Sequence, residues 1–170
     1  MADYVASISV DTVVDALAGF IGPFVSNAAI VRGQINRVSY PAGQFVKLTE
    51  VHQANLQFSR TEYQKTSGAN SATIYGPKRI DIQVDFYGAN AGEYCAVFKT
   101  AIQGEWGWDQ FQQNIRPLYA SEAFQVPLIT GEQQYESRWT LTVSMQYNPN
   151  FTTPQQYASN ATANLILADA

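Results

Sequence analysis

The sequence predicts an α+β fold: a mainly antiparallel β-sheet with two or so helices packed on one face and a long β-hairpin arm. Two runs of strict alternation, residues 80–87 and 139–147, place apolar side chains on one face and polar side chains on the other. A period of two is typical of a strand with one buried face and one solvated face. Two stretches with helical spacing and a long segment between two strands complete the prediction.

The N-terminal third predicts one helix and one strand. Apolar residues fall at helical spacing over residues 11–29, and Asp11 is placed to cap the helix start. Gly22-Pro23 is expected to bend or interrupt this helix, because proline has no backbone N–H to donate. A strand follows over residues 44–58. Its alternation slips near Glu50-Val51, which predicts a bulge or bend.

Residues 59–77 have no periodicity and are rich in Ser, Thr, Gly and Asn, so they predict a long hairpin loop between two strands. A loop of this length is uncommon unless it has a function. It carries four of the ten basic residues at or just beyond its limits: Arg60, Lys65, Lys78 and Arg79. We interpret it as an arm that reaches into a neighbouring subunit, and the alternative is a solvated, mobile loop.

The C-terminal half predicts a second helix and a last hairpin. Residues 89–103 have helical spacing, Gly104 to Trp108 closes that helix, and residues 109–115 are expected to form a short helix or turn. Residues 118–128 and 132–147 are expected to pair around a turn at Ile129-Thr130-Gly131.

From Asn148 onward the chain is polar and irregular, so we expect a single α+β domain at residues 1–150 and an extended C-terminal tail at residues 151–170. The apolar triplet Leu165-Ile166-Leu167 ends this tail. Such a triplet after a polar tether is either a docking tail or a strand added to a sheet edge, and a frayed end is the alternative.

The composition favours a subunit of an assembly. Charged residues make up 14% of the chain, below the usual share of about a quarter, whereas ten Tyr, nine Phe and three Trp are present. Interfaces are depleted in Lys and Glu and enriched in aromatic residues. A Tyr-rich soluble monomer is the alternative that composition alone leaves open.

Charge and cysteine content exclude several classes of protein. A net charge of −4 argues against a protein that wraps nucleic acid, because phosphate binding needs a positive field. The single cysteine, Cys95, excludes an internal disulfide and is expected to be a buried small hydrophobe in a helix. The sequence has no apolar stretch of about 20 residues and no basic signal region at its start, so we expect a protein made and kept in a cytoplasm.

The sequence predicts no catalytic residues, no metal site and no cofactor. His52 is the only histidine and lies in a predicted strand, without a second histidine or a thiol beside it. There is no Gly-x-Ser-x-Gly motif and no phosphate-binding glycine loop. Asp81 and Asp85 share a strand face but are too far apart in sequence for a shared-proton pair. The protein is therefore expected not to be an enzyme.

The order of elements, with strand residues 79–88 and a closing hairpin over residues 119–149, resembles the tail terminator (tail-completion, or neck) proteins of tailed bacteriophages, in particular the neck terminator-like group. The resemblance covers about residues 11–149. It implies a subunit of a hexameric ring in the tail or neck of the virion, assembled in the host cytoplasm. Such a ring caps the tail tube, ends its polymerisation and joins the tail to the head connector, without enzymatic activity or a cofactor.

The expected partners follow from this resemblance: further copies of the chain, the tail tube protein, possibly the sheath, and the head-side connector or adaptor. No membrane and at most transient contact with DNA in the lumen are expected. The candidate interface residues are those of the arm, of the solvated strand face and of the tail: Arg60, Tyr63, Lys65, Tyr75, Lys78, Asp81, Gln83, Asp85, Leu165, Ile166 and Leu167. Trp106 and Trp108 are either interface anchors or core residues under the second helix.

Three alternatives remain open at the level of the sequence. The first is another ring component, either a head–tail connector or a tail tube subunit. The second is a small-molecule hydrolase or binding module, with a site between helix and sheet. The third is a nucleic-acid-binding adaptor, which the acidic composition disfavours.

Overall fold

The structure is a computed structural model that describes residues 6–34, 39, 41–66, 69–126, 128–129 and 135–155. Three α-helices, one 3₁₀ helix and eleven strands lie in these ranges. In chain order they are α1 (Val10–Ile21), η1 (Gly22–Phe24), β1 (Ala29–Arg32), β2 (Phe45–Asn55), β3 (Arg60–Thr66), β4 (Ala69–Tyr75), β5 (Lys78–Tyr87), α2 (Ala91–Gln103), α3 (Glu105–Asp109), β6 (Ile115–Ala120), β7 (Phe124–Gln125), β8 (Leu128–Ile129), β9 (Tyr135–Glu136), β10 (Arg138–Tyr147) and β11 (Asn150–Pro154).

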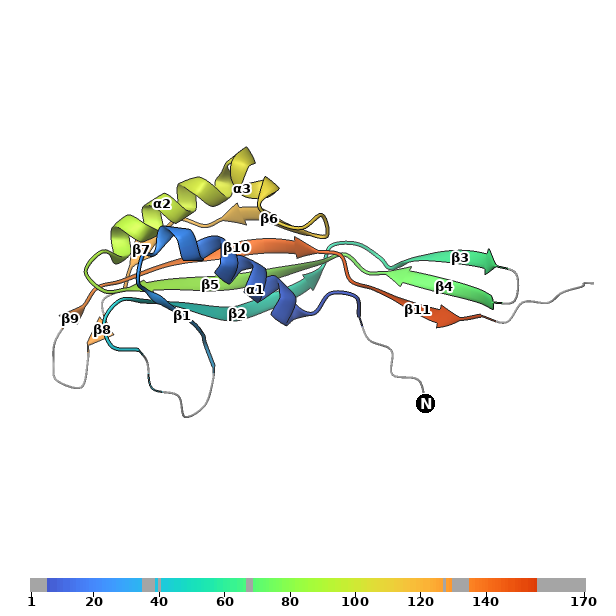
Figure 1. The fold of residues 1–170 in the computed structure, drawn as a ribbon, viewed down its shortest axis with the longest axis horizontal. Coiled ribbons are helices and arrows are strands. Elements are labelled where there is room, and N and C mark those ends of the chain that lie inside the picture. The colour runs from blue at the N-terminus through green and yellow to red at the C-terminus, as the bar shows by residue number, and fades with distance from the viewer. Residues whose placement is uncertain are drawn as a thin grey trace, which may run out of the picture.

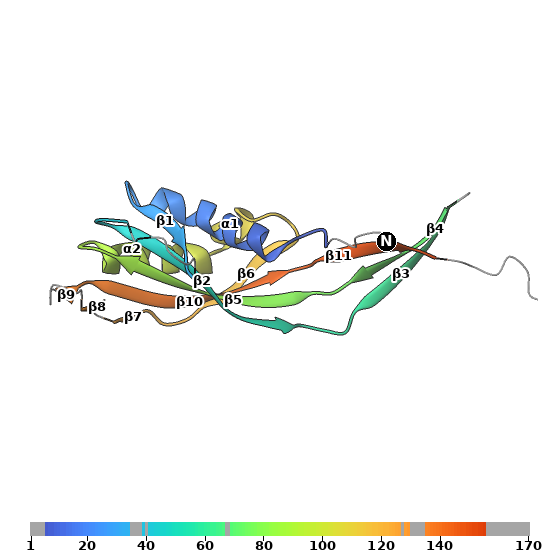
Figure 2. The ribbon, with the colours of Figure 1, turned by 90° about the horizontal axis from the view of Figure 1, so that it is seen from below.

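The body of the molecule is one six-stranded sheet with helices on one face (Figures 1 and 2). Its strand order is β1-β2-β5-β10-β6, and β7 lies beside β10. Only β1 and β2 run parallel, and all the other pairs are antiparallel. The two strictly alternating segments of the sequence are β5 and β10, which pair with each other along their whole length. The predicted α+β class is therefore confirmed.

The core lies between this sheet and its helices. From β5, the side chains of Ile80, Ile82 and Val84 are fully buried, and β10 contributes its own apolar face beside them. Burial of this apolar area is the main stabilising contribution to the body. Cys95 of α2 is buried in the same core, as the sequence analysis predicts.

The first helix is shorter than its sequence pattern suggests. It ends at Ile21, where Gly22-Pro23 begins the 3₁₀ turn, so the predicted interruption is confirmed. The prediction that Asp11 caps the helix is wrong, because the Ser9 side chain accepts the hydrogen bond from the backbone of Thr12. Asp11 instead pairs with Arg32. The short strand β1, which contains Arg32, was not predicted.

A bulge interrupts β2 at the position where its alternation slips. The register between β2 and β5 shifts between Glu50 and His52, which leaves Val51 as the extra residue. Such an insertion bends a strand and increases its twist. The predicted bulge near Glu50-Val51 is confirmed.

Beyond the body, the chain forms a separate three-stranded sheet, which we call the arm (residues 60–75 and 150–154). Its order, β3-β4-β11, repeats the order β2-β5-β10 of the three body strands from which it continues, and it projects away from the helices (Figures 1 and 2). The predicted hairpin is thus present, but its two legs are seven-residue strands rather than an irregular loop.

Two further predictions about the C-terminal half need correction. Strand β11 lies in a stretch that was predicted to be irregular, and it pairs with β4 over five residues. The last hairpin is interrupted, because β6 pairs with one half of β10 and β7 with the other. Residues 109–115, predicted to form a short helix or turn, contain turns between α3 and β6. The predicted turn residues Thr130 and Gly131 lie outside the described residues.

No helix in the described ranges has the length and apolar character needed to cross a membrane.

Candidate assembly surfaces

The polar face of β5 was predicted to be solvated, and for Asp85 this is wrong. Its side chain is fully buried between strands on either side. Arg138 on β10 donates to it at 2.9 Å, Gln83 donates at 2.9 Å, and the ammonium group of Lys47 on β2 lies at 3.4 Å. A buried carboxylate needs such partners, because an unpaired buried charge is very costly.

Electrostatics at Asp85 favour its charged form. Burial alone would raise the pKa of the Asp85 carboxyl, but hydrogen bonds from Gln83, Thr140 and Arg138, together with the guanidinium charge, lower that pKa below its usual value. Asp85 therefore holds three adjacent strands together. Asp81 and Gln83 on the same face are half-buried, and Asp81 accepts hydrogen bonds from Ser144 and from Arg79.

The arm has two chemically different faces, because residues opposite one another in register share a face. Tyr63 and Ala72 lie opposite each other, and Thr61, Ile74 and Phe151 form the next row. We call these five residues the apolar arm face. Its two aromatic side chains are partly exposed, Tyr63 at 66% and Phe151 at 37%.

The opposite face of the arm, the polar arm face, is built from Arg60, Glu62, Thr73, Tyr75 and Thr152. The Arg60 guanidinium lies 5.5 Å from the centre of the Tyr75 ring and pairs with Glu62. The hydroxyls of Thr73 and Thr152 hydrogen-bond at 3.0 Å.

The arm residues singled out from the sequence are divided between these faces. Tyr63 and Lys65 share the side of the apolar arm face, whereas Arg60 and Tyr75 lie on the polar arm face. Lys78 begins β5 in the body. The triplet Leu165-Ile166-Leu167 lies outside the described residues.

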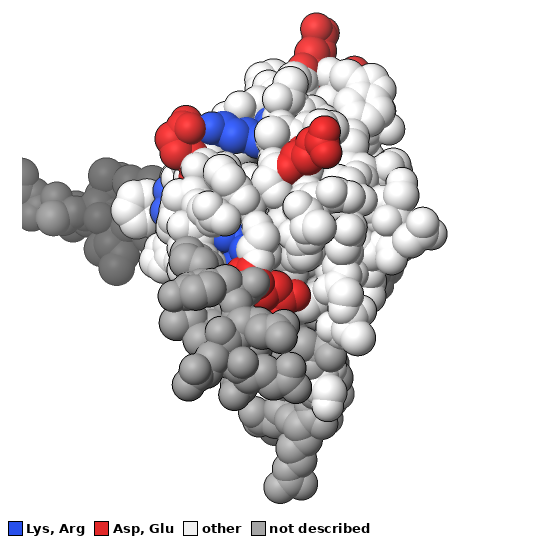
Figure 3. Space-filling model, turned by 90° about the vertical axis from the view of Figure 1, so that its left-hand side faces the viewer, with Lys and Arg blue, Asp and Glu red and all other residues white. Residues whose placement is uncertain are grey.

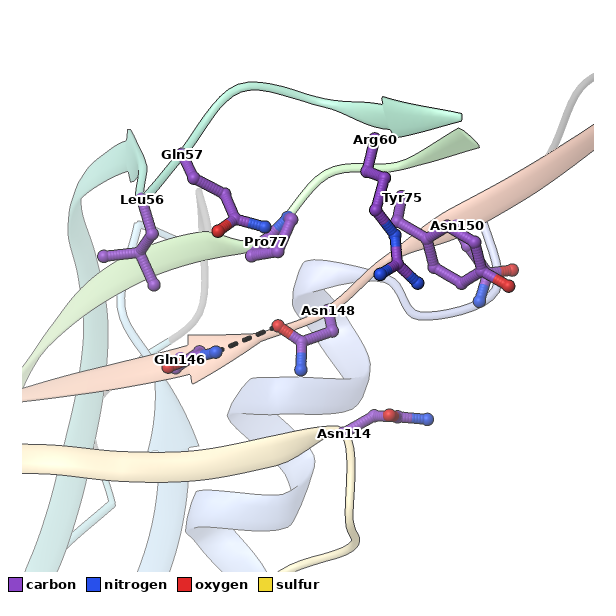
Figure 4. A pocket seen from close by; sticks show the side chains of 9 residues that line it. All are labelled: Leu56, Gln57, Arg60, Tyr75, Pro77, Asn114, Gln146, Asn148 and Asn150. Atoms are coloured by element: carbon purple, nitrogen blue, oxygen red, sulfur yellow. Dashed lines mark hydrogen bonds between the residues drawn. The ribbon is translucent and has the colours of Figure 1, made fainter. Parts of the chain in front are cut away.

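A hollow of about 470 Å³ lies where the arm joins the body (Figure 4). Nine residues from the strand ends of the two sheets and from the loops beside them line it: Leu56, Gln57, Arg60, Tyr75, Pro77, Asn114, Gln146, Asn148 and Asn150. The Gln146 amide donates to the Asn148 side chain at 3.1 Å. The lining residues are mainly amides, joined by the Arg60 guanidinium and the Tyr75 hydroxyl, so the hollow offers mostly neutral hydrogen-bonding groups.

The sequence analysis missed several exposed apolar side chains. Phe58, in the connection from β2 to β3, is 98% exposed, and the nearby Leu56 is 44% exposed. At the edge of the body sheet formed by β6 and β7, Tyr119 and Phe124 are more than half exposed. In the sequence these residues look like ordinary strand residues, so only their position in the fold distinguishes them.

The two tryptophans near α3 are not core residues. Trp106 is 58% exposed and Trp108 is 46% exposed. The Trp106 ring still contacts its neighbours on one side, with its centre 5.9 Å from that of Phe20 and 6.3 Å from that of Phe24.

The described surface at the end of the molecule opposite the arm is largely uncharged, and a few acidic and basic side chains are scattered over it (Figure 3). Among the described residues, no cluster of three or more His, Cys, Asp and Glu side chains is placed to hold a metal ion. His52 is exposed on β2, opposite Asp81 in register.

Comparisons with known proteins agree with this architecture. A sequence model of the phage neck terminator protein family matches residues 11–168. The solved structure of the sheath/tube terminator of an extracellular contractile injection system (PVC), in its extended state, shares the fold with a TM-score of 0.62 at 10% identity. That match covers 98% of this chain and 65% of the other, so this chain spans a little less than two thirds of that terminator's length.

No curated protein matches the chain. The family match covers nearly the whole of it, and a neck terminator is a structural part of the virion tail and neck rather than an enzyme. The chain belongs to the phage neck terminator protein family.

Proposed function

We propose that this protein caps the tail tube as a hexameric ring, ends tube polymerisation and joins the tail to the head-side connector. The observation that carries the proposal is the arm, a sheet that continues three body strands and projects beyond the helices. Its outer strands, β3 and β11, each pair with one neighbour among the described residues. An open strand edge presents backbone N–H and C=O groups that pair with a strand of another chain.

The mechanism is edge capping. The arm pairs with the last ring of the tube and leaves no equivalent acceptor for another tube subunit. Backbone pairing supplies affinity, and side chains on the arm supply the choice of partner. Among the arm residues proposed as contacts, Tyr63 has an exposed side chain on the apolar arm face and Arg60 on the polar one.

We propose that the partners of the ring are the tail tube, the sheath where one is present, and the head-side connector. The PVC protein of similar fold is described as a terminator of both sheath and tube, which supports contact of this chain with a tube and, where a sheath is present, with the sheath. We include Asp81, Gln83 and the triplet Leu165-Ile166-Leu167 among the proposed contacts. Asp85 is excluded, because it is fully buried within its own chain.

The experiment that tests the arm is its removal. Ser59 and Gly76 lie close together at the base of the arm, so a short Asn-Gly turn joins them in place of residues 60–75. We expect the body to keep its circular dichroism spectrum, while tails assembled with this variant lose control of tube length and fail to join heads. The control is Gln64→Ala, an exposed arm position, and normal tails are expected from it.

Normal tube length and normal head joining without the arm would overturn edge capping. The ring is checked separately, by light scattering and negative-stain images of the purified protein. Closed single rings are expected, whereas long tubes would identify a tube subunit instead.

A further inference from the structure

We propose that neighbouring copies in the ring are joined head to tail, with Phe58 of one copy inserted into an apolar hollow beside α3 of the next. This inference rests on the proposed ring and adds the surfaces that build it. It starts from two features of the molecule that lie on different elements and that complement each other in size, polarity and charge.

The first feature is Phe58, an aromatic side chain that is 98% exposed. It lies in the connection from β2 to β3, where the chain leaves the body and enters the arm. Together with the nearby Leu56, which is 44% exposed, it gives this connection two exposed apolar side chains, and aromatic side chains are common anchors of interfaces.

The second feature is a hollow of about 390 Å³ between α1 and α3. Its lining is mostly apolar and consists of Ala16, Gly19, Phe20, Pro23, Trp106, Gln110, Phe111 and Gln112. Phe20 packs against two other aromatic residues of the lining. The centre of its ring lies 5.1 Å from that of Phe111 and 5.9 Å from that of Trp106. Trp106 is partly exposed, so an aromatic side chain from outside has an aromatic wall to pack against.

Phe58 does not fill this hollow in its own chain. The residues around Phe58 and those lining the hollow have no member in common, and Figure 1 places α3 over the body while the β2–β3 connection lies where the arm begins. A protruding group on one surface that fits a cavity on a different surface produces a head-to-tail contact, which closes into a ring when the rotation allows it.

Charge favours a second copy of this chain as the occupant. Helices α1 and α3 and the η1 turn carry four carboxylates and no Lys or Arg. Asp11 and Asp15 pair with Arg32, but Glu105 and Asp109 on α3 form no ion pair with another described residue. Arg116 donates to the carbonyls of Trp108 and Phe111 and is the cation beside this end of the helix.

The segment that carries Phe58 has the opposite balance. Residues 56–78 contain Arg60, Lys65 and Lys78 against the single acid Glu62. The helices beside the hollow, with more carboxylates than cations, therefore meet a segment with more cations than carboxylates, which orients the two copies as they associate.

Two variants remove the two halves of the contact separately. Phe58→Ala removes the inserted side chain. Gly19→Leu fills the hollow from within, because a Cβ built at Gly19 meets no atom within 4 Å and this glycine lines the hollow. The matched controls are Phe124→Ala, another exposed aromatic position, and Gly19→Ala, which adds only a methyl group.

Sedimentation velocity is the readout. We expect each of the two variants alone to associate at least about thirtyfold more weakly than the parent chain, as for a central anchor of an interface, and both controls to associate normally. Mixed together, the two variants are expected to form a one-to-one dimer that grows no further, because only one Phe58 and one open hollow can meet. Normal rings from Phe58→Ala, or no dimer in the mixture, would overturn the inference.

A cysteine pair separates this inference from the proposed function. Cys95 is buried, so Gln57→Cys combined with Gln110→Cys introduces two reactive thiols beside the proposed contact while Phe58 itself is kept. A disulfide ladder between copies is expected on oxidation of assembled rings. Rings that form without this cross-link would overturn the Phe58 contact and leave the ring intact. Failure of the parent chain to form a ring, even on tail tubes, would overturn the proposed function and this inference with it.

Discussion

At the scale of single residues, Asp85 is a fully buried charge that joins three strands of the body sheet. It is fully buried between Lys47 and Arg138, whose side chains are 15% and 20% exposed. Removing one member of a buried pair leaves the others uncompensated, at a cost of roughly 3–5 kcal/mol. We expect Asp85→Asn to lower the free energy of unfolding by about 3 kcal/mol, the low end of that range, because both cations are partly exposed.

Urea denaturation measures this loss. The matched control is Glu122→Gln, because the Lys99–Glu122 pair is an exposed one in which the Glu122 side chain is 92% exposed. Exposed pairs contribute less than about 1 kcal/mol. Equal losses in the two variants would contradict the role given to Asp85.

The same carboxylate predicts a pH dependence. The pKa of Asp85 is lowered in the folded chain, so its contribution to stability is present above the unfolded pKa of about 3.9 and is lost as the pH falls through the folded pKa. The parent chain is therefore expected to lose stability below about pH 4 more steeply than Asp85→Asn. Thermal unfolding from pH 6 to pH 2.5 tests this, and parallel curves for the two proteins would contradict it.

Cys95 is expected to be chemically inert in the folded protein. It is fully buried in the core, and burial raises the pKa of its thiol to about 11. Because the thiolate is the reactive form, a thiol reagent at pH 7.5 is expected to label native protein only as fast as the core opens. Labelling followed by mass spectrometry, with and without denaturant, measures this; rapid labelling of native protein would contradict it.

At the scale of elements, α3 packs against α2 because position 107 has no side chain. Gly107 is buried, and a Cβ there would overlap the Ala101 carbonyl of α2. Since that obstacle is backbone, the helices must separate to make room. Gly107→Ala is expected to cost about 2 kcal/mol of unfolding free energy, as for an overpacked core.

A second glycine provides the control for this prediction. Gly19 lies in the exposed part of α1, where a Cβ meets nothing within 4 Å. Gly19→Ala is expected to stabilise the protein by about 0.5–1 kcal/mol, because glycine loses more backbone freedom in a helix than alanine does. Denaturation of both variants under the same conditions decides the matter, and a neutral Gly107→Ala would show that α3 is not held against α2.

The elements that the sequence predicted well are those whose pattern comes from burial on one face. Strands β5 and β10 and helix α2 each present one continuous apolar face to the core. The spacing of apolar residues along the sequence therefore reveals these elements. Strands β3, β4 and β11 have no such face against the body, so their Ser-, Thr- and Asn-rich sequence resembled a loop. Their pairing depends on the register between distant segments.

The same distinction applies to the candidate surfaces. Sequence placed the arm correctly, but which side chains share an arm face depends on strand register. Asp85 looked solvated because alternation marks polarity and not exposure, and cations from two other strands bury it. Phe58 and the hollow beside α3 were not found, since each is defined by the absence of neighbours in three dimensions.

At the scale of the whole molecule, charge is unevenly distributed. Residues 56–78, which include β3 and β4, carry three of the ten basic residues and one of the fourteen acidic ones, so the rest of the chain holds seven basic and thirteen acidic residues. A basic arm region on an acidic body makes each subunit an electrical dipole. In a head-to-tail ring, the basic region of one copy faces the acidic body of the next, which accelerates productive encounters.

This distribution predicts that ring assembly depends on salt. Raising the salt concentration from 50 to 500 mM shortens the screening length from about 14 Å to about 4 Å, so the attraction between neighbours is largely lost before contact. We expect the assembly rate to fall by about tenfold, while dissociation of formed rings changes little, since apolar contacts hold them. Stopped-flow light scattering measures both rates. Glu105→Lys combined with Asp109→Lys should slow assembly at low salt and remove most of its salt dependence. Glu93→Lys combined with Glu122→Lys, at two exposed positions outside α3, is the control with the same change in net charge. An assembly rate that is independent of salt would mean that the charge asymmetry does not orient the subunits, and the order of contacts would then have to come from shape alone.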